Sequence, residues 1–265
     1  MDRSGNPALS ESTFDVYAEA GEGTMTLAGT ATKTLFLFIL LLVGAAYTWT
    51  QTMATFSYEN IAVLKEAGKI GTLSSVPTNV WGYIVFGSLA GFVAAMVCIF
   101  VPRLWIVTWV YAGLEGICLG AFSAMFEYMY PGIALQAVGL TFGTFLVLLL
   151  AYTSGVVKAT ENFTLGVIAA TGGICLLYLA TIVLGMFGIQ MPFIHETGWA
   201  GIGLSVFIVI IAALNLVLDF DFIEQGCDQG APKYMEWRGA FGLMVTLVWL
   251  YLEILRLLAK LRSKD

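Results

Sequence analysis

The sequence predicts an all-α, polytopic membrane protein built as a seven-transmembrane-helix bundle, and three observations favour this class. Hydrophobic residues make up 59% of the 265 residues and charged residues only 11%, whereas soluble domains carry about 25% charged residues. The mean hydropathy is +0.87. The charges are absent from long stretches of the chain, and each stretch has the length of about 20 residues that an α-helix needs to cross a bilayer.

Seven apolar segments meet this length requirement. In chain order they are Leu35–Phe56, Val80–Val101, Trp105–Phe126, Gly132–Ser154, Leu165–Ile189, Trp199–Leu218 and Gly239–Leu261. The connections between them are mostly short, which places consecutive helices antiparallel and adjacent. Residues 1–33 are polar and lack the basic-then-apolar pattern of a cleaved signal peptide. We therefore expect a flexible N-terminal tail over residues 1–33 and a transmembrane domain over residues 34–265.

Small residues recur at the spacing that lets helices pack closely. The pairs are Gly87 with Gly91, Gly116 with Gly120, and Gly139 with Gly143. Glycines four residues apart lie on one helix face and allow the backbone of a neighbouring helix to approach. Plain bundle packing is the favoured interpretation of all three pairs.

Several function classes are excluded by what the sequence lacks. The four cysteines form no CxxC pair, and His195 is the only histidine, so a disulfide framework or a histidine-rich metal site is not indicated. There is no HExxH, GxSxG, P-loop or dinucleotide-binding glycine motif. No basic stripe favours a nucleic-acid partner. We expect neither an enzyme nor a bound cofactor.

Acidic residues inside the apolar segments are the candidate functional residues, because a charge in the bilayer is costly and usually faces the bundle interior. Glu115 lies near the middle of the third segment, and its carboxyl is either structural or a ligand for a proton or cation. Asp219 and Asp221 end the sixth segment. Asp221 is easily placed in the headgroup region, whereas Asp219 directly follows an apolar run.

The seventh segment carries charges at both ends. Glu236 and Arg238 flank an aromatic residue before it, as is typical of a membrane-interface anchor. Glu253 and Arg256 lie about one turn apart and are able to pair, and a structural role is favoured for this pair. Acids brought together from separate helices share a proton or a cation and titrate as a unit.

A resemblance covers nearly the whole chain and is most specific near the C-terminus. It rests on the stretches 25–34, 111–116, 214–224, 234–237 and 242–258. The chain resembles the bacterial, YccA-like branch of the Bax-inhibitor family, whose transmembrane Bax inhibitor motif (TMBIM) gives the family its other name. The resemblance implies a seven-helix fold with the last helix central, and a pH-dependent leak of calcium across the membrane.

The resemblance also implies a pH sensor made of two acids, one closing the sixth span and one within the seventh. Asp219 matches the first. An ungapped alignment puts Thr246 at the second position, and a shifted alignment puts Glu253 there. An arginine of the family is matched weakly by Arg103.

The sensor's second member is therefore sought among the remaining acids, Glu253, Glu236 and Glu115, with Asp221 as a further pH-sensing candidate. Asp219 with Glu115 is the predicted site for Ca²⁺ or a proton. Oxygen ligands suit Ca²⁺. Arg256, Arg103 and Thr246 are supporting residues.

The leading hypothesis is thus a pH-sensitive cation leak channel or transporter, with Ca²⁺ or protons as its partners. The alternative is a non-transporting regulator that binds a membrane AAA protease or another membrane protein through its N-terminal tail. The expected location is the bacterial cytoplasmic (inner) membrane. The short loops favour a cytoplasmic N-terminus, although Lys260, Arg262 and Lys264 at the other end argue against it.

Overall fold

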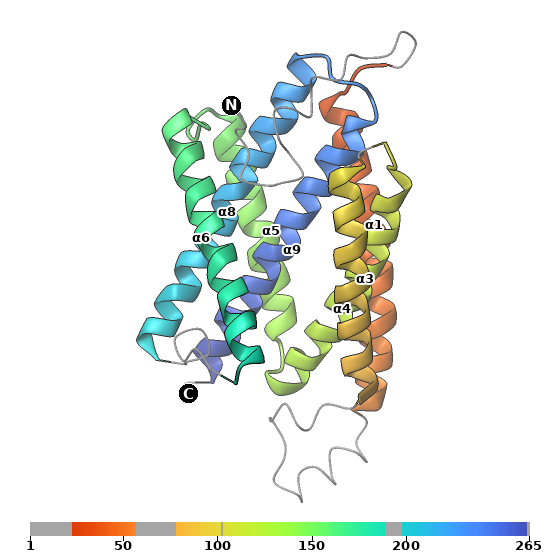
Figure 1. The fold of residues 1–265 in the computed structure, drawn as a ribbon, viewed down its shortest axis with the longest axis vertical. Helices are drawn as coiled ribbons and strands as arrows, with labels where there is room; N and C mark the ends of the chain where they lie inside the picture. The colour runs from red at the N-terminus through yellow and green to blue at the C-terminus, as the bar shows by residue number, and fades with distance from the viewer. Residues whose placement is uncertain (1–22, 57–77, 102, 189–197, 264–265) are drawn as a thin grey trace, which may run out of the picture. The chain divides into compact units, whose positions relative to one another are not determined.

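Helices account for nearly all of the structure in the computed structural model, which describes residues 23–56, 78–101, 103–188 and 198–263 (Figure 1). The helices in these ranges are α1 (Leu27–Thr55), α3 (Thr78–Phe100), α4 (Ile106–Met129), α5 (Ile133–Thr153), α6 (Glu161–Met186), α8 (Trp199–Asp228) and α9 (Met235–Arg262). The only β-type pairing within the described ranges is an isolated bridge between Thr24 and Pro232.

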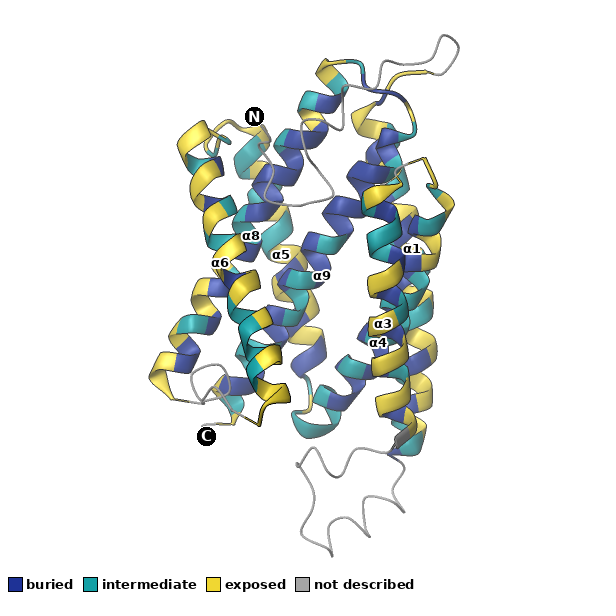
Figure 2. Cartoon of the chain, in the orientation of Figure 1, coloured by how far each residue is buried: buried dark blue, intermediate teal, exposed yellow. Residues whose placement is uncertain are grey.

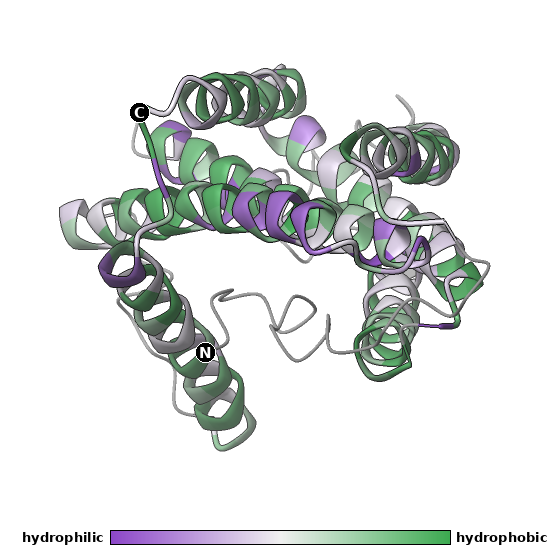
Figure 3. Cartoon of the chain, turned by 90° about the horizontal axis from the view of Figure 1, so that it is seen from above, coloured by the Kyte–Doolittle hydropathy of each residue, from purple (hydrophilic) through white to green (hydrophobic). Residues whose placement is uncertain are grey.

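The fold class predicted from hydropathy is confirmed. In the described part of the chain, 7 helices are long and apolar enough to cross a membrane. Seen from above, hydrophobic residues dominate these helices, and hydrophilic residues are confined to a few turns (Figure 3). The protein is therefore a multi-pass helical membrane protein.

Two helices extend farthest beyond the predicted segments. α1 begins at Leu27, before the predicted start at Leu35 and inside the stretch expected to be a flexible tail. α8 continues to Asp228, beyond the predicted end at Leu218. The acids after Leu218 do not end the helix, because Phe220, Phe222 and Ile223 around them stay buried against protein.

The chain divides into two compact units, and each is described by itself. Unit 1 comprises Met1–Thr30 and Ala137–Asp265, and unit 2 comprises Ala31–Gln136. In unit 1, α8 packs on α9 and α6 packs on α8. Figure 2 shows buried residues along most of α8 and α9, whereas α6 is largely exposed. Within unit 1 the last helix is therefore the most enclosed one, with Met244 and Leu250 fully buried.

Glycines set the helix contacts of unit 2, where α3 packs on α4. A Cβ at Gly116 would overlap the carbonyl oxygen of Leu41 on α1, and a Cβ at Gly120 would overlap that of Ala45. A Cβ at Gly87 would lie 2.9 Å from the backbone nitrogen of Cys118. The predicted close packing is thus present at these glycines.

The third glycine pair behaves differently. A Cβ at Gly139 or Gly143 on α5 meets nothing within 4 Å. The expectation that this pair packs against a neighbouring helix is wrong for the described residues, because α5 turns these glycines to an open face.

Candidate functional site

Asp219 is the most deeply buried acid among the described residues of unit 1. It lies in α8 between Leu218 and Phe220, and its side chain is 0% exposed. One turn earlier, the Asn215 amide donates to the Thr171 hydroxyl and to the Ile211 carbonyl oxygen, both at 2.8 Å. Asp219 therefore lies inside the protein, as expected for an acid with a task in the bundle, and its part in a pH sensor stays a prediction.

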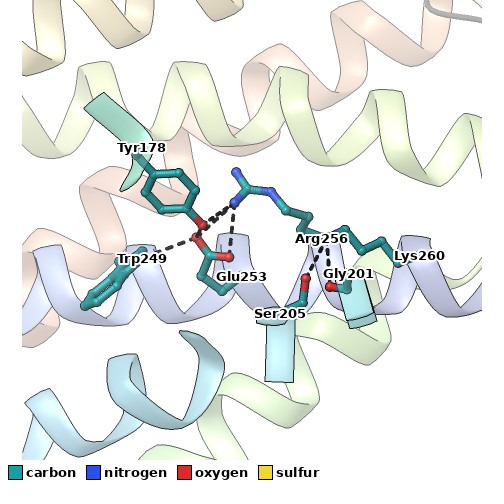
Figure 4. A network of polar contacts seen from close by, with 7 residues as sticks. All are labelled: Tyr178, Gly201, Ser205, Trp249, Glu253, Arg256 and Lys260. Carbon is teal, nitrogen blue, oxygen red and sulfur yellow. Dashed lines mark hydrogen bonds and ion pairs between the residues drawn. The ribbon is translucent and has the colours of Figure 1, made fainter. Parts of the chain in front are cut away.

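Glu253 is the centre of a polar network between α6 and α9 (Figure 4). Its carboxylate accepts hydrogen bonds from the Tyr178 hydroxyl at 2.7 Å and from Trp249 Nε1 at 3.3 Å. Arg256 Nη1 donates to both carboxylate oxygens at 3.1 Å and to the Tyr178 hydroxyl at 2.6 Å. The predicted Glu253–Arg256 pair is thus formed, and Tyr178 joins it to α6.

The two partners of this ion pair differ in burial. The Glu253 side chain is 3% exposed, whereas that of Arg256 is 39% exposed. The Arg256 guanidinium also lies 5.3 Å from the centre of the Tyr178 ring, within the range of a cation–π contact. Arg256 therefore neutralises a buried carboxylate with one edge while its other side remains accessible.

Lys260 lies one turn beyond Arg256 and is 8% exposed. Its ammonium group donates to Ser205 Oγ at 2.8 Å and to the Gly201 carbonyl oxygen at 3.1 Å. Both acceptors are neutral and belong to the first turns of α8. Lys260 thus fastens the end of α9 to the start of α8 (Figure 4).

Glu236 lies at the other end of α9 and is 1% exposed. Its Oε1 accepts hydrogen bonds from the Thr26 backbone N–H at 3.0 Å and from the Thr26 hydroxyl at 2.9 Å. Thr26 Oγ1 in turn accepts from the Gly29 N–H at 3.0 Å, as an N-cap residue does. Glu236 is thus enclosed by protein rather than exposed to the surroundings, and its carboxylate holds the first turn of α1.

The segment directly before α1 also contacts the connection between α8 and α9. The Met25 N–H donates to the Ala231 carbonyl oxygen at 2.7 Å, and Thr24 forms the isolated bridge with Pro232. A Cβ at Gly29 would overlap the Glu236 carboxylate. The stretch from Gly23 to Thr30 is therefore docked on the α8–α9 connection.

Glu115 belongs to unit 2. It is half-buried in α4, and a Cβ at Gly91 of α3 would lie 3.2 Å from its Oε2. The carboxylate thus occupies the space left by a glycine. The predicted site that combines it with Asp219 would join residues of the two units and stays a prediction.

The remaining predicted residues have diverse surroundings. Asp221 is half-buried and accepts a hydrogen bond from Gln225 at 2.6 Å. Thr246 is 3% exposed in α9, and Arg103 is exposed in the turn between α3 and α4. Over the described ranges, no group of three or more His, Cys, Asp or Glu side chains is arranged to hold a metal ion.

Several site residues were missed by sequence reasoning. Tyr178 lies in an apolar run, and the signal was a hydroxyl in the middle of a span, which needs a partner. Lys260 follows Arg256 by four residues and so shares its helix face. Glu127 on α4 accepts from the backbone N–H groups of Gly132 and Ala134 and caps α5.

These observations define a class, a multi-pass helical membrane protein whose last two helices enclose acidic side chains. The chain matches the family model described as "Bax inhibitor 1 like" over residues 6–263. It therefore belongs to the Bax inhibitor 1 like family. No curated protein and no solved structure matches the chain.

Proposed function

We propose that this protein is a pH-sensitive cation leak channel or transporter of the Bax-inhibitor type, with Ca²⁺ as the favoured ion. The observation that carries the proposal is the complete burial of Asp219 in a membrane-spanning helix that packs on α9. Ionisable residues inside membrane spans are rare and mark ion pathways and proton relays. Family membership supports the same reading.

Two further acids support a response to pH. Glu236 and Glu253 are 1% and 2% exposed, and both lie on α9. A buried charge depends on its partners, so taking up a proton changes the contacts that the carboxylate makes. Glu115, against the glycine face of α3, is the proposed lining residue of the path in unit 2.

The test is ion flux through the purified full chain in liposomes that enclose a calcium indicator. Wild-type protein is expected to pass Ca²⁺ above empty liposomes, at a rate that changes with pH. Asp219→Asn should remove most of that pH dependence. Asp228→Asn, at the exposed end of the same helix, is the matched control and should behave as wild type. Flux equal to that of empty liposomes at every pH would refute the proposal.

The alternative function, a non-transporting regulator that binds a membrane AAA protease, is supported by the docked segment from Gly23 to Thr30. This segment is hydrogen-bonded to Glu236 at the start of α9 and to Ala231 before it. Deleting residues 1–22 leaves the docked segment in place. Loss of protease binding with unchanged flux would favour the regulator, whereas loss of flux with unchanged binding would favour the channel. We place the protein in the bacterial inner membrane with a cytoplasmic N-terminus.

A further inference from the structure

The ends of two helices meet at one end of unit 1. α8 begins at Trp199 and α9 ends at Arg262, and both ends lie low in the view of Figure 1. The hydrogen bond from Lys260 to the Gly201 carbonyl oxygen joins them. Trp199 is 80% exposed, and tryptophans of membrane proteins gather at the level of the lipid headgroups. This end of the unit therefore lies near the headgroups.

Arg256 reaches this level. It precedes the end of α9 by six residues, which is about 9 Å along a helix. The long side chain of an arginine extends toward the interface when its backbone lies deeper in the bilayer. Its exposed fraction of 39% shows that part of the guanidinium is open to the surroundings.

The polar network around Glu253 uses only one of the three nitrogens of the Arg256 guanidinium. All of its hydrogen bonds to described residues run through Nη1 and go to Tyr178 and Glu253. In Figure 4 the other terminal nitrogen points away from these two residues. The Nε–H and the two N–H groups of Nη2 form a fork whose geometry matches a phosphate or carboxylate. In a medium with little water, such donors need acceptors.

The local charge favours an anion. Arg256 and Lys260 supply two positive charges, and Glu253 supplies one negative charge. The two hydrogen-bond acceptors of Lys260, Ser205 and Gly201, are neutral. The first turn of α8 and the last turn of α9 meet here, so the opposite partial charges of these two helix ends offset one another and the preference for an anion rests on the side chains.

We propose that the outward edge of Arg256, with Lys260 behind it, binds the phosphate of an anionic phospholipid. Tyr178 holds the guanidinium plane in place from one side, and Glu253 fixes Nη1, so the free fork is presented to the lipid in a fixed orientation. Basic pockets between membrane-spanning helices are a known mode of recognising anionic headgroups. This lipid site is independent of the proposed ion flux.

The first test uses the wild-type protein alone. The full chain is purified in detergent with equal amounts of phosphatidylglycerol and phosphatidylcholine, and bound lipid is counted by native mass spectrometry. Retention of phosphatidylglycerol in clear excess over phosphatidylcholine is expected. Equal retention of the two lipids would overturn the proposal without any variant.

The second test separates Arg256 from the ion pair. Removing Arg256 alone would leave a buried carboxylate unbalanced, so the informative variant is the double substitution E253Q/R256Q, with E253Q as its matched control. E253Q keeps Arg256 and an amide oxygen that is able to accept from Nη1, so it is the reference for the double variant and should still retain phosphatidylglycerol in excess over phosphatidylcholine. The double variant should bind about 10-fold more weakly, as expected for the loss of charge-assisted hydrogen bonds.

Equal binding by E253Q and E253Q/R256Q would show that Arg256 is not the lipid ligand. Inorganic phosphate added to the same samples distinguishes a site for a lipid phosphate from a site for the free ion. Phosphatidylglycerol should stay bound in its presence, because the acyl chains hold the lipid against the helices. Complete displacement by inorganic phosphate would overturn the assignment to a lipid.

Discussion

The Glu253–Arg256 pair predicts an asymmetry between two substitutions that break the same contact. Arg256→Gln leaves Glu253, whose side chain is 3% exposed, without its cation. Glu253→Gln leaves Arg256, whose side chain is 39% exposed and able to reach acceptors outside the bundle. The cost of breaking the pair is set by the partner that stays behind. Arg256→Gln should therefore be the more damaging change.

The magnitudes follow from the contacts. Leaving a buried charge alone costs about 3–5 kcal/mol. Glu253 retains two neutral donors, Tyr178 and Trp249, and each such hydrogen bond is worth about 1 kcal/mol. The net loss for Arg256→Gln is then about 1–3 kcal/mol. Glu253→Gln keeps an oxygen for these donors, so its loss should stay near the value of about 1 kcal/mol or less that applies to partly exposed pairs.

The assay is equilibrium unfolding of the three variants and the wild type in the same detergent, evaluated as a double-mutant cycle. The double variant E253Q/R256Q is expected to be more stable than R256Q alone, because no charge is left unbalanced in the bundle. The reasoning is refuted if E253Q is as destabilised as R256Q, or if the second substitution adds its full cost to the first.

Two further predictions concern helix contacts. Gly116→Ala should destabilise the protein by about 1–3 kcal/mol in detergent unfolding, because the new methyl group overlaps the Leu41 carbonyl oxygen. Gly139→Ala places its methyl group in open space, so it should be neutral or stabilising by up to about 1 kcal/mol. Equal losses of stability in the two variants would contradict this prediction. Glu236→Gln should weaken the hold on Thr26 by about 1 kcal/mol, seen as faster hydrogen exchange at the start of α1, and unchanged exchange there would contradict the assignment.

The membrane-spanning segments could be predicted from the sequence because hydropathy is a property of each segment alone. The C-terminal end of α8 could not, since hydropathy alone does not distinguish an acid facing protein from one facing water. The sequence predicts a span that ends at Leu218, directly before Asp219, yet the helix runs to Asp228. The start of α1 was missed for a related reason, because Thr26 caps the helix only with the help of Glu236, 210 positions away in the chain.

The candidate site shows the same limit. The pairing of Glu253 with Arg256 follows from helix spacing within one segment. The contribution of Tyr178 depends on the packing of α6 beside α9, and the contacts of Lys260 depend on where α8 begins. Such contacts between segments are set by tertiary structure, and no sequence pattern predicts them.

The family resemblance implies a sensor in which two carboxylates share a proton, and the two buried acids of α9 also accept hydrogen bonds from neutral groups. Thr246, at one of the two matched positions, has no acidic proton to share. Glu236 and Glu253 each bind a specific partner outside α9: Thr26, directly before α1, and Tyr178 on α6. In the proposed function, a proton taken up by Glu236 removes the charge toward which Thr26 donates. Glu253 is instead held by Arg256, whose Nη1 donates to both of its carboxylate oxygens at 3.1 Å. Glu236 thus binds the start of α1, whereas Glu253 binds a cation of its own helix.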